Sequence, residues 1–102
     1  MEKTIAGKVI HLNEEGYFTN MEEWNEEIAK ELAKEENLDL SGRHFDVLNY
    51  LRDQQKKDVA LTIRGVGKSG VVDIKEFYAL FPKGPLKISS KLAGIPKPKS
   101  CI

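Results

Sequence analysis

The feature that most limits how this chain can fold is a stripe of apolar residues at helical spacing early in the sequence. Between residues 20 and 37, apolar side chains recur every three or four positions, and glutamates fill the positions between them. This spacing predicts an amphipathic helix with one buried face. Asn20, with Glu23 three positions later, indicates where the helix begins, and Asn37 indicates where it ends. The stripe consists of Met21, Trp24, Ile28, Ala29, Leu32 and Ala33.

A β-hairpin is predicted for residues 3–18, before that helix. Two β-branched pairs stand on either side of the turn residues Ala6-Gly7-Lys8, which is the pattern of short strands joined by a tight turn. A second turn is expected at residues 13–16. Because an isolated hairpin is only marginally stable in water, we expect it to pack against the helices.

Three more helices are predicted, separated by capping and turn residues. The first begins at Ser41 and ends near residue 55, and the second begins at Asp73 and ends before Pro82. The third is a short amphipathic helix over residues 86–93 that stops at Gly94. The apolar residues expected to face inward are Phe45, Val47, Leu48 and Leu51 in the first, and Ile74, Phe77, Tyr78 and Phe81 in the second.

The stretch DVALTIRGVGKSG, residues 58–70, fits two structures. Val59, Leu61 and Ile63 alternate as in a strand, yet they fit a short helix equally well, and three glycines interrupt either element. The GKS at residues 67–69 is not a phosphate-binding loop, because position 62 is threonine where that motif requires glycine.

Charge is balanced over the whole chain but not along it. Sixteen Lys and Arg offset sixteen Asp and Glu in 102 residues, so no net field favours nucleic acid or a membrane surface. Glutamates gather between residues 14 and 36, whereas the segment from Lys83 to the end holds lysines and no acid. No stretch has the length of a signal peptide or a membrane span, and one cysteine suits a reducing compartment. We therefore expect a cytoplasmic protein.

The single cysteine is next to last, in the sequence IPKPKSCI. Two prolines favour an extended arm, and residues 95–101 would span about 20 Å at ~3.1 Å per residue. A free thiol has a pKa of about 8.5. Lys97 lies close in sequence and favours the thiolate, as Arg64, Lys87 and Lys91 would if the arm folds back. Cys101 is therefore a candidate reactive thiol.

The two histidines do not indicate a metal site. His11 and His44 stand far apart, and the chain has neither His-x-x-x-His nor Cys-x-x-Cys spacing. We expect a hairpin histidine and a helix-surface histidine, with no metal and no cofactor.

The end of the chain, LFPKGPLKISSKLAGIPKPKSCI, resembles the C-terminal signature of the DsrC/TusE family, also described as the sulfite-reductase gamma-subunit family. The stretches GYFTNMEEWNEEIAKELAKEENLDLS and HFDVLNYLRD resemble its first two helices. The resemblance implies a mainly α fold, a small helical bundle with an N-terminal β-hairpin and a flexible C-terminal arm. Residues 1–94 would form the helical domain, and residues 95–102 the mobile arm.

The resemblance also implies a function. Family members are sulfur carriers rather than conventional enzymes, and the penultimate cysteine, here Cys101, holds the sulfur as a persulfide. The donor in the TusE branch is a small relay complex and the acceptor a tRNA 2-thiouridylase. In the DsrC branch the arm inserts into dissimilatory sulfite reductase. Arg64, Lys87 and Lys91 resemble family basic residues near the arm.

Two departures from the family pattern affect the choice of branch. The DsrC branch has a second cysteine in the helix before the arm, and this chain has Ser90 there, which favours a one-cysteine carrier similar to TusE. The segment between Arg64 and Phe81 is shorter than in the family and rich in glycine, which leaves the partner open.

Two rival functions remain. A non-carrying subunit or regulator could dock the arm into dissimilatory sulfite reductase without loading sulfur. A nucleic-acid binder could use the basic tail, but zero net charge and a tail without aromatic residues argue against that.

Overall fold

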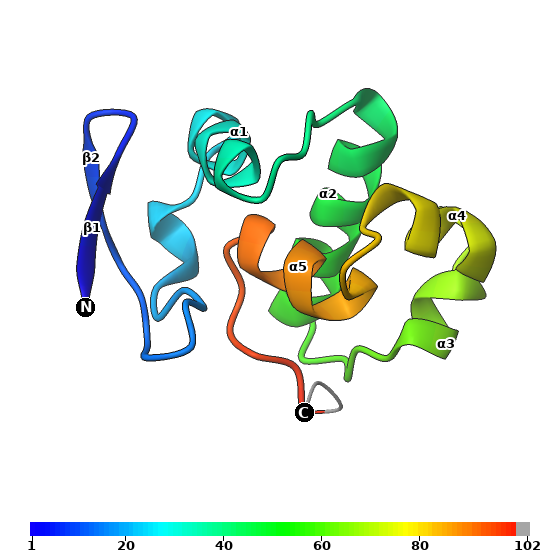
Figure 1. Ribbon diagram of the computed structural model, residues 1–102. Coiled ribbons are helices and arrows are strands. Elements are labelled where there is room, and N and C mark those ends of the chain that lie inside the picture. The colour runs from blue at the N-terminus through cyan, green and yellow to red at the C-terminus, as the bar shows by residue number, and fades with distance from the viewer. Residues whose placement is uncertain (100–102) are drawn as a thin grey trace.

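A two-stranded hairpin lies at one edge of a group of helices (Figure 1). The computed structural model describes residues 1–99, so Cys101 lies outside the described residues. The mainly helical fold with an N-terminal hairpin is confirmed. The elements are β1 (Glu2–Ile5), β2 (Lys8–His11), the 3₁₀ turn η1 (Met21–Glu23), α1 (Glu26–Glu35), α2 (Gly42–Lys56), α3 (Ile63–Gly67), α4 (Ile74–Leu80) and α5 (Pro85–Leu92).

The hairpin forms where the sequence predicts it. β1 and β2 are antiparallel, with Ile5 opposite Lys8. Ala6 and Gly7 join them, with φ angles of 51° and 77°, as a two-residue turn matched to the twist of the strands requires. The hairpin packs against the helices as expected, because Ile10 is fully buried in a cluster that includes Ile28 of α1.

The predicted start of the first helix is wrong by several residues. Asn20 caps only the short turn η1, and its side chain accepts a hydrogen bond from the Glu22 amide (3.0 Å). α1 begins at Glu26, because Asn25 is its N-cap and accepts from the Ile28 amide (2.8 Å). Glu23, expected in a capping box, instead binds the hairpin.

Asn37 does end α1, as predicted. Its φ angle is 58°, and the following Leu38 amide donates to the Ala33 carbonyl (2.9 Å). A left-handed residue at this position satisfies carbonyls that the helix leaves unpaired. α2 begins after Ser41, which accepts from the His44 amide, and runs through residue 56, in agreement with the prediction.

Within residues 58–70 the chain forms the short helix α3 at Ile63–Gly67, and none of these residues is in a strand. Thr62 caps α3 and accepts a hydrogen bond from the Gly65 amide (2.8 Å). α3 packs chiefly against α4, and Gly67 permits the approach, because a Cβ atom there would collide with the Ile74 side chain.

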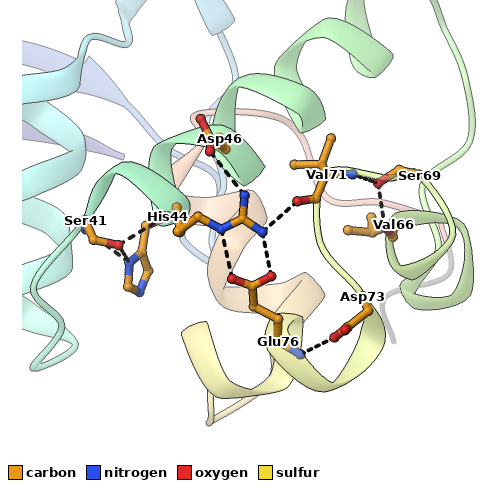
Figure 2. Close-up of polar contacts among 9 residues, drawn as sticks. Ser41, His44, Asp46, Val66, Ser69, Val71, Asp73 and Glu76 are labelled. Atoms are coloured by element: carbon orange, nitrogen blue, oxygen red, sulfur yellow. Dashed lines mark hydrogen bonds and ion pairs between the residues drawn. The ribbon is translucent and has the colours of Figure 1, made fainter.

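α4 begins after Asp73, whose carboxylate accepts from the Glu76 amide (2.7 Å). The carboxylate of Glu76 does not complete a capping box. It binds Arg43 of α2, whose guanidinium also donates to the Val71 carbonyl (2.8 Å) (Figure 2). Glu76 thereby ties the start of α4 to α2.

Of the four residues predicted to face inward in and after α4, the structure buries two. Phe77 and Phe81 are fully buried, whereas Ile74 and Tyr78 are 42% and 47% exposed. Phe77 and Phe81 are four residues apart and so lie on one face of the helix. That face covers the core. Tyr78 and Ile74 remain partly exposed, and Ile74 also packs against Gly67 of α3.

α5 is the central element of the core. It lies among α1, α2 and α4 and contacts each of them (Figure 1). The sequence predicts an amphipathic helix, but even the hydroxyl-bearing Ser89 and Ser90 are fully buried. The buried side chains around α5 include Val47, Leu48, Leu51, Phe77, Phe81, Leu86, Ile88 and Leu92.

Candidate functional site

The outer face of α5 consists of lysines. Of residues 85–92, Lys87 is exposed and Lys91 half-buried, and the other six are buried. Lys87 and Lys91 are one helical turn apart, so their ammonium groups share one face. A helix packed on nearly all sides thus presents only positive charge to solvent.

Lys97 lies near these two lysines, because all three interact with the carboxylate of Glu15. Lys97 Nζ lies 2.8 Å from Glu15 Oε2. The pKa of the Glu15 carboxyl is lowered, first by the hydrogen bond from Lys97 and further by the charges of Lys97, Lys87 and Lys91. The structure therefore brings together three of the four basic residues named from the sequence. We call Lys87, Lys91 and Lys97 the lysine face.

Glu15 was not named as a site residue from the sequence. It lies in the turn predicted at residues 13–16, where Asn13 Oδ1 accepts hydrogen bonds from the amides of Glu15 (2.9 Å) and Tyr17 (3.0 Å). The Asn13 to Gly16 turn signal places Glu15 outside a helix, but no local pattern shows that it meets a lysine 82 positions later.

Lys91 is held against the same turn. Its Nζ atom lies 5.4 Å from the ring centroid of Tyr17, within the range of a cation–π contact. A Cβ atom at Gly16 would lie 3.6 Å from that Nζ, so the Lys91 side chain lies directly against the turn backbone. The turn at residues 13–17 therefore positions both Glu15 and Lys91.

The fourth basic candidate, Arg64, is not among the charges that lower the pKa of the Glu15 carboxyl. It is exposed on α3, which packs chiefly against α4. Its proposed role near the arm stays a prediction.

Trp24 and Arg52 fix the chain where it leaves α5. Trp24 Nε1 donates to the Leu92 carbonyl (2.6 Å), and Arg52 donates to the carbonyls of Ala93 (2.9 Å) and Met21 (3.0 Å). The guanidinium carbon lies 4.4 Å from the centroid of the Trp24 ring, and burial lowers the pKa of Arg52. These two side chains set the direction of the following segment.

Gly94 is required at this point. Its φ angle is +68°, and a Cβ atom there would lie 2.5 Å from Trp24 Cδ1. Beyond it, Ile95 is fully buried in the core and Pro98 is also buried, while Pro96 and Lys99 are exposed. The described part of the C-terminal segment is thus packed against the body at two residues. The mobility of residues 95–102 stays a prediction.

Ser90 is buried without a partner. Its side chain is 0% exposed, and within the described part of the chain its hydroxyl forms no hydrogen bond. An unpaired buried hydroxyl is unfavourable, so we expect Ser90 to lower the stability of the fold.

The two histidines connect secondary-structure elements. His11 Nδ1 lies 2.7 Å from Glu23 Oε2, and its Nε2 lies 3.1 Å from Glu2 Oε2. His44 Nε2 lies 3.0 Å from the Leu80 carbonyl oxygen. Among residues 1–99, no group of three His, Cys, Asp or Glu side chains could hold a metal ion. In the same residues no helix has both the length and the apolar character to cross a membrane.

The fold and the site define a class of protein: a small helical domain whose last helix shows only lysines to solvent and leads into a short basic segment. A family model described as DsrC like protein matches residues 4–102. The chain belongs to the DsrC/TusE family.

Individual relatives cover nearly all of the chain. It is 34% identical over 103 residues to the dissimilatory-type sulfite reductase subunit gamma of Nitratidesulfovibrio vulgaris, with 99% of this chain and 98% of that one covered. It is 36% identical over 106 residues to the sulfurtransferase TusE of Escherichia coli, with 96% and 97% covered. The crystal structure of the oxidized gamma-subunit of the dissimilatory sulfite reductase (DsrC) from Archaeoglobus fulgidus matches with a TM-score of 0.82 at 34% identity, and both chains are covered completely (100%).

Proposed function

We propose that this protein is a persulfide carrier in a sulfur relay, in which Cys101 accepts a sulfur atom from a donor and passes it to an acceptor protein. The observation that carries this proposal is the position of the single cysteine, next to last in the chain and shortly after the lysine face. Membership of the DsrC/TusE family and the likeness to the sulfurtransferase TusE of Escherichia coli support it. The protein acts in the cytoplasm as a carrier rather than a conventional enzyme.

The transfer needs no oxidant. The Cys101 thiolate attacks the outer sulfur of a donor persulfide, a new S–S bond forms at Cys101, and the S–S bond of the donor breaks, so that the donor leaves as a thiolate. The proton on the outer sulfur passes to solvent as the new persulfide ionises. Lysines near the arm stabilise the anion on Cys101 in both states, and Arg64 is a further candidate for this role.

The partners are proteins: a donor relay complex and an acceptor such as a tRNA 2-thiouridylase or dissimilatory sulfite reductase. Because position 90 is serine and has no thiol, a disulfide between this position and Cys101 is chemically impossible. This favours a one-cysteine carrier that passes on a persulfide.

Intact-protein mass spectrometry after incubation with a persulfide donor tests the proposal. The wild-type protein is expected to gain one sulfur atom that reductant removes, and Cys101→Ser is expected to gain none. Circular dichroism of Cys101→Ser should match the wild type, because the change replaces one sulfur atom by oxygen next to the end of the chain. Failure of wild-type protein to gain sulfur from competent relay donors would refute the carrier function.

The alternative is a non-carrying subunit that docks its C-terminal arm into dissimilatory sulfite reductase. The likeness to the gamma subunit of Nitratidesulfovibrio vulgaris favours it. In that case Cys101→Ser and wild type would bind the reductase equally, and neither would carry sulfur.

A further inference from the structure

The lysine face carries more positive charge than the protein itself neutralises. Within residues 1–99, Lys97 pairs with Glu15, while Lys87 and Lys91 form no ion pair. Only one of the three ammonium groups is therefore ion-paired within these residues, although the whole chain has no net charge. Every other side chain of α5 is committed to the core, so this face can change its partners without disturbing the packing of the helix.

In the Glu15–Lys97 ion pair, a carboxylate from another molecule can readily replace that of Glu15. Lys97 and Glu15 are 32% and 56% exposed, and an ion pair in such a position contributes little to stability. It nevertheless joins the turn after β2 to the segment that leads away from α5. A carboxylate from another molecule could replace Glu15 at Lys97 at little cost.

We propose that the lysine face docks a partner protein through clustered carboxylates, and that Glu15 occupies Lys97 in the free protein as an internal competitor. The proposal rests on the proposed function, because the partner would be one that exchanges sulfur with the arm. Docking transfers Lys97 from Glu15 to the partner, and the segment after α5 then becomes attached to the partner instead of the turn.

The surroundings of the lysine face favour carboxylates of a protein over a nucleic acid. Single-stranded nucleic acids bind where bases can stack on accessible aromatic rings beside a basic groove, and Tyr17, the aromatic residue beside Lys91, is only 1% exposed. Carboxylates need no such stacking surface, so the lysine face suits an acidic protein segment better than a nucleic acid.

The first test compares two adjacent glutamates by titration with poly-L-glutamate at low salt. Glu15→Gln removes the internal competitor and should tighten binding about threefold, the scale of an exposed ion pair. Glu14→Gln changes the net charge equally but removes no ion pair among residues 1–99, so it is the matched control and should have a clearly smaller effect. Equal effects of the two variants on binding would refute the proposal that Glu15 competes with the ligand for Lys97.

The second test compares two exposed lysines and two polyanions. Lys87→Gln should weaken poly-L-glutamate binding about threefold, whereas Lys75→Gln on α4 should leave it nearly unchanged. Equal weakening of binding by the two variants would refute the proposal that the lysine face is the binding site. A single-stranded oligonucleotide of equal charge should bind more weakly than poly-L-glutamate, and tighter binding would overturn the choice of a protein partner.

These titrations are separate from sulfur loading. Loss of poly-L-glutamate binding with normal loading of Cys101 would refute this docking surface alone. Normal binding by the lysine face in a protein that never gains sulfur would refute the carrier function alone.

Discussion

Replacing Gly94 by alanine should destabilise the fold by an amount that the structure allows us to divide into two parts. The positive φ angle of +68° costs a residue with a Cβ atom about 1–2 kcal/mol. The Cβ atom would also lie 2.5 Å from Trp24 Cδ1 and 2.7 Å from Trp24 Cβ and Cγ, and such overpacking costs about 1–3 kcal/mol. We therefore expect the free energy of unfolding of Gly94→Ala to fall by about 2–5 kcal/mol.

Gly70→Ala is the matched control, because Gly70 has a φ angle of +87° and no atom within 4 Å of the added Cβ. It should lose only the backbone part, about 1–2 kcal/mol. Urea denaturation followed by far-ultraviolet circular dichroism measures the stability of both variants. Tryptophan fluorescence is unsuitable, because the signal of Trp24 itself would change with its surroundings in Gly94→Ala. If Gly94→Ala is no less stable than Gly70→Ala, the packing of Trp24 on the start of the C-terminal segment is wrong.

Three further predictions concern the helix start, the buried hydroxyl and the hairpin. Asn25→Ala should lower the free energy of unfolding by about 1 kcal/mol, and Asn20→Ala by less; the reverse order in urea denaturation would contradict the α1 start at Glu26. Ser90→Ala should raise the free energy of unfolding by about 1 kcal/mol, and a loss in the same assay would mean that the hydroxyl is paired. The pKa of His11 is raised above its ordinary 6.5, chiefly by its hydrogen bond to Glu23. Its stabilisation is therefore complete below pH 6.5 and is lost as pH rises through the raised pKa. The urea midpoint of wild type should fall more than that of His11→Gln between pH 6 and pH 9, and parallel profiles would refute this coupling.

Local signals in the sequence predicted most of the fold. Ser41 and Asp73 cap the helices that follow them, and Asn37 ends α1 through its left-handed backbone. Each of these signals acts on backbone groups within a few residues. The prediction failed at Asn20, because a second capping asparagine, Asn25, follows five positions later. Glu23 binds the hairpin residue His11, and the helix begins after Asn25.

The site was less predictable, because its contacts join distant parts of the chain. The lysines were named from the sequence, yet Glu15 meets Lys97 across 82 positions. Arg52 likewise reaches Ala93 from 41 positions away. Such pairs depend on the packing of α5 between α1 and α2, and no spacing within a short segment reveals them.

The burial of Ile95 determines what fraction of the molecules can extend the C-terminal segment from residue 95 onward. Ile95 is 0% exposed, and exposing such a side chain costs about 1.5–3 kcal/mol. Because each 1.4 kcal/mol is tenfold in an equilibrium, molecules with Ile95 released should be on the order of one in ten to one in a hundred. An acceptor that needs the chain extended from residue 95 would then bind with its intrinsic affinity reduced by that fraction, whereas one that leaves Ile95 in the core would not pay this penalty. The depth of an acceptor's pocket would thus help to select which partners the carrier serves.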